Sequence, residues 1–579
     1  MELKQNGQFL KKAYNKALIP CILSVLSGNI NILADGILVG QRLGTDALAA
    51  VNFSLPVYLT LCVAGSFIVS GTAICASDAI GRNRPERAQE LYRLSVFWCC
   101  AVSAALTVAG LICLEPLAAF LCPDERVAVL VAEYTAVTVS GALPKILIYI
   151  PFWFLRLDGR NGQVTLMMFV MGAGNVALDV LFLYVLDMGV FGAGLASVLS
   201  TALACVLGFL RLCDKKSNFR FGVCVFGKDV SFAEIVRAGS PSAANNLFQT
   251  LRVSVVNGLL LAWYGSEMVA VFTAVNCIAA FEESVTGGVP QAASAMLGIY
   301  SGEHDNESAG LLMRRQLKSG LPCALLFSAV IIPAGGLVSG AYGLETPLFF
   351  PFLCMSLGII PALINCVLAG YYNVSGRALW ANGIIFLRVF AMSCASLFLL
   401  LCFGKNPWWF LFFGEILTLA VWFVLSGIGH RRNPSLSRFL LMDNTLAEKG
   451  NVINFSVDSR IENICDASSR ISGFCEKNGM LPGQTMRISL AMEEIMTLVS
   501  AENESDVEFD LRVYCLLGAI GIRIRYSGKE FNPLVCKNDE NDTYMGIRLI
   551  ESMVEQTMYQ RTFGMNTVQI FVEGKAGEQ

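Results

Sequence analysis

Residues 163–187 read QVTLMMFVMGAGNVALDVLFLYVLD, and this stretch carries the main features of the whole chain. It is long enough to cross a bilayer as a helix, which takes about 20 apolar residues. Asn175 and Asp179 lie four positions apart inside it, so they share one face of the helix. Because an ionisable group at membrane depth costs about 2.5–3.5 kcal/mol, Asp179 predicts a functional site within a membrane-spanning segment.

Comparable apolar stretches recur along the chain with short polar breaks. Of the 579 residues, 55% are hydrophobic and 15% charged, and the mean hydropathy of +0.59 excludes a soluble enzyme of this size. The expected fold class is an all-α polytopic membrane protein with twelve transmembrane helices. The predicted spans are 17–41, 49–79, 92–114, 130–155, 163–187, 191–212, 236–263, 268–300, 319–340, 346–372, 379–402 and 407–429.

The positive charges predict the orientation of these spans. Lys and Arg concentrate before the first span and in alternate loops, and the loops between carry few of them. Both termini are therefore expected in the cytoplasm, in a bacterial inner membrane. The first apolar segment continues for a full span and is expected to remain as helix one rather than be cleaved. His304 and His430, the only histidines, fall at helix ends, which excludes a His-based zinc site or catalytic triad.

The chain also matches itself. A shift of 221 residues pairs Gly44-Thr45-Asp46 with Gly265-Ser266-Glu267 and Gly81 with Gly302, and a shift of 217 pairs Gly159-Arg160 with Gly376-Arg377. Two six-helix lobes of the same membrane orientation follow, an arrangement typical of transporters that move one lobe against the other around a central site. The predicted divisions are an N-lobe (1–213), an inter-lobe loop (214–235), a C-lobe (236–430), a linker (431–450) and a soluble C-terminal domain (451–579).

Buried polar residues mark candidate sites in both lobes. Asp35, Asn175 and Asp179 could share a cation, or one carboxylate could hold a proton; alternatively they satisfy packed neighbours. Neither shift brings an acid onto Asp35 or Asp179, so ion coupling by these groups would belong to the N-lobe.

A second acidic feature, Glu282-Glu283, lies in the eighth predicted span. Adjacent helical residues point about 100° apart, so at most one is expected to face a cavity, where it would contact substrate. Asn246 and Gln249 add candidate cavity residues, although hydrogen bonding between helices is the commoner use of such groups. Lys145 beside Pro144 is interpreted as marking a kink near a helix interface.

Residues 10–430 contain several short motifs. They are Leu33-Ala34-Asp35-Gly36-Ile37-Leu38-Val39-Gly40, Leu43-Gly44, Ala47-Leu48-Ala49-Ala50, Pro56, Phe154-Leu155-Arg156-Leu157-Asp158-Gly159, Asn175, Asp179, Gly192, Ala193, Ala196 and Ser197. These motifs resemble those of the multidrug and toxic compound extrusion (MATE) transporters. The resemblance implies that Asp35, Asn175, Asp179 and Ser197 form a cation site, with sodium as the only metal ion in question, and no cofactor is required. It also implies export of organic cations, drugs or amphipathic compounds across the lipid bilayer in exchange for H⁺ or Na⁺.

From Asn451 onward the composition is that of a soluble domain. The pattern predicts an α+β sandwich with helices on one face of a sheet. Strands are expected at 452–457, 507–515, 518–526, 557–562 and 566–573, and helices at 458–478, 483–501 and 544–555.

Five motifs stand out in this domain. They are Leu490-Ala491-Met492-Glu493-Glu494, Gly528-Lys529-Glu530-Phe531-Asn532-Pro533, Met545-Gly546-Ile547, Tyr559-Gln560-Arg561 and Gly564-Met565-Asn566. With these motifs the domain resembles the GHKL ATPase fold, in the branch of anti-sigma serine kinases. Glu494 matches the general base, but Leu498 stands where the family has a magnesium-binding Asn, and Tyr526 replaces the Asp that pairs with adenine. With Gly528 and Gly546 these residues would line a degenerate pocket, so ATP and magnesium are expected to bind weakly or not at all.

The sequence therefore favours an efflux transporter and not an enzyme. The C-terminal domain of this transporter is expected to bind a cytoplasmic regulatory protein, and no nucleic-acid partner is expected. Two alternatives stay open. One is a lipid-linked oligosaccharide flippase, for which a basic cavity and extra helices would be expected. The other is a membrane sensor whose tail binds a sigma-factor-type regulator.

Overall fold

The structure, a computed structural model, describes residues 7–82, 84–122, 125–214, 217–222, 232–341, 347–442, 451–503, 507–516, 519–534, 556–562 and 565–573. The chain forms two compact units. One consists of Tyr14–Ser426 and the other of the chain on either side of it. The first unit is helical, and the second contains a five-stranded sheet.

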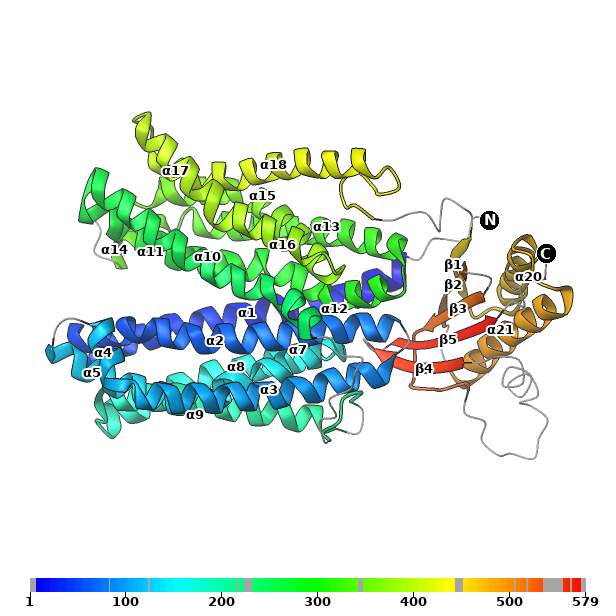
Figure 1. Ribbon diagram of the computed structural model, residues 1–579, viewed down its shortest axis with the longest axis horizontal. Coiled ribbons are helices and arrows are strands. Elements are labelled where there is room, and N and C mark those ends of the chain that lie inside the picture. Colours follow the sequence, from blue (N-terminus) through cyan, green and yellow to red (C-terminus); the bar gives the residue numbers. More distant parts are fainter. Residues whose placement is uncertain are drawn as a thin grey trace. The chain divides into compact units, whose positions relative to one another are not determined.

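The first half of the helical unit is one bundle, drawn from blue to teal in Figure 1. Helix α2 packs against α3 and α5, and α8 packs against α9. The elements are α1 (Gly7–Leu43), α2 (Thr45–Gly81), α3 (Pro85–Ile112), α4 (Leu114–Leu121), α5 (Glu125–Ser140), α6 (Ala142–Leu147), α7 (Tyr149–Leu157), α8 (Asn161–Asp179), the π-helical segment η1 (Val180–Val185) and α9 (Gly189–Leu212).

The second half forms the other bundle, drawn from green to yellow. It meets the first half where α2 packs against α10 and α12. Its elements are α10 (Phe232–Tyr264), α11 (Ser266–Thr286), α12 (Gly288–Gly302), α13 (Asn306–Ile331), α14 (Gly335–Ala341), α15 (Phe349–Val374), α16 (Ala378–Ile385), the π-helical segment η2 (Phe386–Ala391), α17 (Met392–Cys402), the 3₁₀ turn η3 (Pro407–Trp409) and α18 (Phe410–Arg432).

The helices confirm a mostly helical, multi-pass membrane protein. Nine helical stretches in the described ranges are long and apolar enough to cross a membrane, or ten if the bent pair Arg126–Ser140 and Ala142–Leu157 forms one span. They coincide with ten of the twelve predicted spans. The predicted spans 236–263 and 319–340 coincide with α10 and with α13 plus α14, which fall outside that apolar set. Polar residues such as Gln249 and Arg252 dilute the apolar character of α10, so a count of twelve stays a prediction.

The backbone supports the internal repeat. Gly44 and Gly265 have φ angles of 86° and 83°, and Gly159 and Gly376 have φ angles of 77° and 75°. Each pair is related by one of the two sequence shifts, and each occupies a conformation that side chains rarely tolerate. The repeat-related Gly81 and Gly302 also meet across the halves, since a Cβ on Gly81 would lie 2.9 Å from the Gly302 Cα. The two lobes therefore share turn geometry and touch through equivalent residues.

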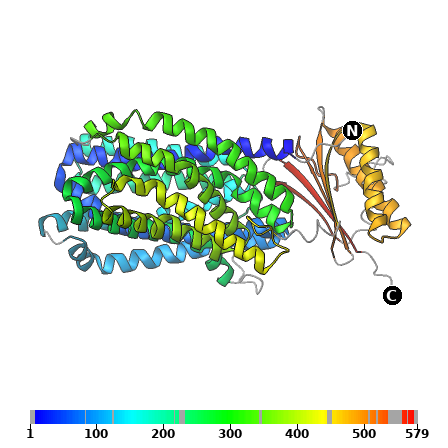
Figure 2. The same ribbon diagram turned by 90° about the horizontal axis from the view of Figure 1, so that it is seen from above.

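The second unit contains an antiparallel sheet in the order β1-β2-β3-β5-β4. Two helices cover one of its faces (Figure 2), and the core between them includes Phe455, Ile471, Ile495 and Ile524. The predicted elements are confirmed to within three residues, except for a helix at 544–555, which lies outside the described residues. They are β1 (Val452–Asp458), α20 (Ile461–Lys477), α21 (Pro482–Glu502), β2 (Glu508–Leu516), β3 (Ala519–Tyr526), β4 (Gln556–Thr562) and β5 (Met565–Glu573).

Candidate transport sites

Helices α1 and α8 bring the predicted N-lobe residues together. Asp35 lies on α1, and Asn175 and Asp179 lie one turn apart at the end of α8. Asn175 and Asp179 are 1% and 0% exposed, and Asp35 is half-buried. The carboxyl groups of Asp35 and Asp179 lie close enough to interact electrostatically. Two acids that are 144 positions apart in the chain, 35 and 179, thus form one buried pair.

These polar atoms have few partners. Within the described part of the chain, both carboxylate oxygens of Asp179, Oδ1 of Asp35 and both side-chain polar atoms of Asn175 are buried without a hydrogen-bond donor or acceptor. Two ionised carboxylates facing each other in a buried site repel strongly, so a proton on one of them or a cation between them is required. The oxygen atoms fit either a proton or a small hard cation.

A π-helical segment, η1, begins at Val180, immediately after Asp179. Such segments are rare and occur frequently at functional sites. Its position supports a functional reading of Asp179 over a purely structural one.

Lys145 was interpreted from the sequence as marking a kink near a helix interface, and the kink is confirmed, because Arg126–Ser140 and Ala142–Leu157 are bent by 58° where they meet. The sequence did not show how deeply Lys145 is buried. Its side chain is 4% exposed, its ammonium lies 5.1 Å from the ring centroid of Tyr58, and it interacts electrostatically with Asp35. A buried cation beside the acidic pair affects the charge balance of the N-lobe site.

Ser197 lies half-buried on α9, which packs against α8. Its main-chain carbonyl accepts hydrogen bonds from Ser200 and Thr201, at 3.1 Å and 2.7 Å. Its place in the cation site stays a prediction.

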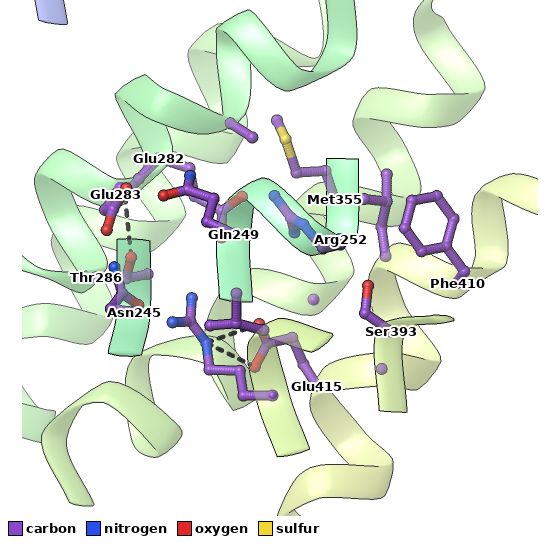
Figure 3. A pocket seen from close by; sticks show the side chains of 16 residues that line it. Asn245, Gln249, Arg252, Glu282, Glu283, Thr286, Met355, Ser393, Phe410 and Glu415 are labelled. Carbon is purple, nitrogen blue, oxygen red and sulfur yellow. Dashed lines mark hydrogen bonds and ion pairs between the residues drawn. The ribbon is translucent and has the colours of Figure 1, made fainter. Parts of the chain in front are cut away.

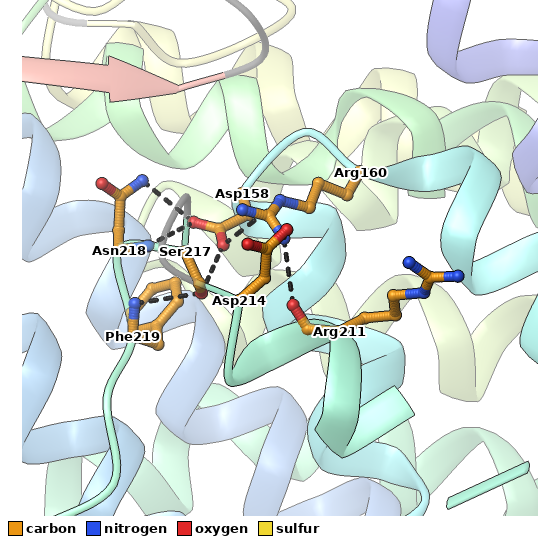
Figure 4. Close-up of polar contacts among 7 residues, drawn as sticks. All are labelled: Asp158, Arg160, Arg211, Asp214, Ser217, Asn218 and Phe219. Carbon is orange, nitrogen blue, oxygen red and sulfur yellow. Dashed lines mark hydrogen bonds and ion pairs between the residues drawn. The ribbon is translucent and has the colours of Figure 1, made fainter. Parts of the chain in front are cut away.

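The contacts made by the loop after α7 show the structural role of the motif Arg156-Leu157-Asp158-Gly159. Figure 4 shows Asp158 accepting hydrogen bonds from the Ser217 hydroxyl, at 2.7 Å, and from the Asn218 side chain, at 2.9 Å. Arg160 donates at 3.0 Å to the Arg211 carbonyl. Burial raises the pKa of the Asp158 carboxyl, and these hydrogen bonds oppose that effect. The motif therefore anchors the chain that leaves α9.

Arg156 of the same motif connects the two lobes. Its guanidinium donates at 2.7 Å to Ser24 of α1 and at 2.6 Å to Gln291 of α12, and it stacks on Phe152. Lobe movement would have to break the bond to Gln291, because α12 belongs to the other bundle.

The C-lobe contains a charged pocket with an empty volume of about 760 Å³. Figure 3 shows side chains from α10, α11, α15, α17 and α18 around it. Arg388 Nε lies 2.8 Å and 3.1 Å from the two carboxylate oxygens of Glu415. The lining residues are Asn245, Gln249, Arg252, Ala279, Glu282, Glu283, Thr286, Met355, Gly358, Arg388, Val389, Ser393, Phe410, Leu411, Gly414 and Glu415.

The pocket corrects two expectations. Glu282 and Glu283 both line it, although only one was expected to. The residues of α11 that line the pocket follow the i, i+3, i+4, i+7 spacing of one helix face, and they are Ala279, Glu282, Glu283 and Thr286. Such a face is about 100° wide or more, so it includes two adjacent residues. Asn246 is not among the lining residues, and its side chain donates at 3.3 Å to the Ser242 carbonyl of its own helix. Gln249 lines the pocket as expected.

Two charged residues of this pocket were missed from the sequence. Arg388 and Glu415 lie within the predicted spans 379–402 and 407–429. The criterion that selected Asp35, an ionisable group at membrane depth, applies to both and would have found them.

In the C-terminal unit the described residues of the predicted nucleotide site lie on α21, at the end of β3 and directly after it. Tyr526 is fully buried, packs on Phe509 and donates at 2.5 Å to the Phe531 carbonyl. Burial raises the pKa of the Tyr526 phenol, which keeps it a neutral donor. Glu494 and Leu498 are half-buried on α21, and Gly528, at a φ of 123°, lies against Asn503. Gly546 lies outside the described residues.

Comparison with known proteins agrees with this architecture. Residues 20–185 match the family model described as MatE. Over 301 residues the chain is 25% identical to the probable multidrug resistance protein YoeA of Bacillus subtilis, which covers 50% of this chain and 64% of that protein. Over 267 residues it is 25% identical to the FAD transporter of Shewanella oneidensis, covering 45% and 59%. The chain thus spans less than two thirds of the length of these curated relatives.

A solved outward-facing multidrug resistance MATE family transporter of the MOP superfamily has the same fold. Its TM-score is 0.67 at 20% identity, and the match covers 73% of this chain and 97% of that one. Two helical lobes with buried ionisable groups define the class as a multi-pass membrane protein. The family model, the relatives and the fold agree that the chain is similar to MATE transporters.

Proposed function

We propose that the chain is a secondary active efflux transporter that exports cationic or amphipathic organic compounds in exchange for H⁺ or Na⁺. The buried Asp35–Asp179 pair carries this proposal, because its oxygens have no donor within the described residues and require a proton or a cation. Twelve spans in two six-helix lobes, with both termini in the cytoplasm, complete the proposed arrangement. The charge distribution of the loops supports this orientation.

The proposed exchange follows from two requirements of the site. A bound H⁺ or Na⁺ neutralises part of the acidic pair, which alters the electrostatic free energy of each lobe state. If ion and substrate favour different states, the ion gradient drives export. Asp35, Asn175 and Asp179 would hold the ion, with Ser197 adding a hydroxyl ligand from α9.

The test is substrate accumulation in a bacterium that lacks its own efflux pumps. Cells that express the chain should accumulate less ethidium than control cells when an inward proton or sodium gradient is imposed, and the difference should disappear when that gradient is collapsed. Equal accumulation in both cell lines, with the protein detected in the membrane, would contradict efflux of this compound class.

A flippase for lipid-linked oligosaccharides is the second candidate, and one observation favours it. The C-lobe pocket contains Arg252 and Arg388, and basic groups in a cavity suit a phosphate-bearing lipid. Arg388 is however paired with Glu415, and Glu282 and Glu283 add negative charge. The charge balance therefore favours efflux of compounds that carry a positive group.

We further propose that the C-terminal unit is a degenerate GHKL-like domain that binds a cytoplasmic regulatory protein. The buried Tyr526 supports this, because its ring occupies core volume where the resembling family exposes an acid to adenine. Leu498 offers no oxygen to magnesium. A sensor role remains the alternative for this unit.

The purified full-length protein should therefore bind a fluorescent ATP analogue no better with magnesium than without it. Fluorescence titration at micromolar protein checks this, with a nucleotide-binding kinase as the positive reference. Saturable binding that depends on magnesium would show that the pocket is intact and would contradict the degenerate assignment.

A further inference from the structure

The charges of the C-lobe pocket divide into a paired and an unpaired set. Arg388 and Glu415 are paired with each other, and Asn365 also donates at 2.8 Å to Glu415. The side chains of Arg388 and Glu415 are 19% and 16% exposed, and their opposite charges neutralise each other within the protein. The pair needs no ligand to balance its charge.

Arg252 belongs to the unpaired set. Its Nη2 donates at 3.3 Å to the Asn276 amide, a neutral acceptor, and its Nε is fully enclosed with no hydrogen-bond partner among the residues that the structure describes. An enclosed guanidinium without a carboxylate partner carries a large desolvation cost. Arg252 can therefore accept an anionic group.

Glu282 and Glu283 face the same cavity from α11 (Figure 3). In the described ranges neither carboxylate has a basic nitrogen within ion-pair distance, and both lie in the electrostatic field of the pocket arginines. Each can accept an ammonium group. Asn245, Gln249 and Arg252 recur on one stripe of α10, so neutral amides continue the same wall beside the guanidinium.

We propose that this pocket binds a zwitterionic compound, with its carboxylate on Arg252 and its ammonium on Glu282 or Glu283. This deepens the proposed function and rests on it. A purely cationic ligand would leave Arg252 without a countercharge and would be repelled by it. A purely anionic ligand would be repelled by two glutamates. With two acids against one unpaired base, the pocket fits a net ligand charge of zero or one positive.

The experiment compares two ligands that differ by one charge. A rhodamine dye with a free carboxylate is the zwitterion, and the methyl ester of the same dye is the cation. Fluorescence polarisation measures binding of both to the purified full-length protein. Wild type is expected to bind both, and Arg252→Gln is expected to weaken the acid about tenfold or more while changing the ester about twofold or less.

Glu283→Gln together with Glu282→Gln is expected to weaken both dyes, because both carry the cationic group. Retained binding of the ester by Arg252→Gln serves as the folding control. Equal weakening of acid and ester by Arg252→Gln, or no binding of the acid by wild type, would overturn the inference. In that case, gradient-driven export of the ester in cells would still support the proposed function. If neither dye nor ethidium is exported, the proposed function itself is contradicted.

Discussion

Cells that express Asp179→Asn are expected to accumulate ethidium to the level of cells without the protein. The amide removes one of the two charges of the buried acidic pair, so the remaining Asp35 no longer needs a shared proton or a bound cation. Loading of the site then ceases to change the free energies of the lobe states, and the gradient can no longer drive export. Accumulation under imposed proton and sodium gradients measures the loss.

The matched control is Asp187→Asn, at the end of the same predicted span. That carboxylate is 73% exposed and pairs with Arg42 at 3.1 Å, so its replacement is expected to leave export unchanged. Both variants must reach the membrane in equal amounts. Full gradient-dependent export by Asp179→Asn would place ion coupling elsewhere, and the C-lobe acids would be examined next.

The buried Arg388–Glu415 pair is expected to dominate the stability of the C-lobe. Arg388→Met leaves Glu415 without its countercharge, and Glu415→Gln leaves Arg388 without one. Removal of one partner of a buried pair typically costs about 3–5 kcal/mol, because an uncompensated charge remains buried. Each single variant should therefore lower the unfolding midpoint of the purified protein clearly.

The double variant Arg388→Met with Glu415→Gln should recover most of the loss. It buries no charge, and the Gln side chain still offers an oxygen to Asn365. Thermal unfolding in detergent, followed by tryptophan fluorescence, ranks the four proteins, and the exposed Asp187→Asn variant should differ from wild type by about 1 kcal/mol or less. A double variant as unstable as the sum of the singles would mean that the two side chains act independently.

The sequence was sufficient to predict the positions of the helices and strands. Apolar runs long enough for a bilayer, and alternating patterns in the tail, depend on local composition, so their positions followed directly. The repeat could also be read from Gly44, Gly159, Gly265 and Gly376, because turns with positive φ strongly favour glycine. The number of membrane spans cannot be read from apolar composition in the same way, because α10 is a long helix that also carries the polar residues of the pocket.

The charged sites show the limit of local reasoning. The sequence named Asp35 and Asp179 as residues that could share a cation, but only the packing of α1 against α8 places their carboxyl groups in one buried pair. The kink predicted at Pro144 and Lys145 is present, but only the fold shows that the Lys145 ammonium lies over the ring of Tyr58. Arg388 and Glu415 satisfied the same sequence criterion but gained their meaning from a partner on another helix.

By itself the sequence determined that the chain is a multi-pass helical membrane protein, that its two halves repeat and that an α+β unit follows. Length, hydropathy and turn residues act over a few positions, so they can be read without the fold. The tertiary structure alone decided which charges neutralise each other and which face a cavity. Those relations depend on distances between helices that are far apart in the chain, and electrostatic free energy changes steeply with such distances in a buried environment.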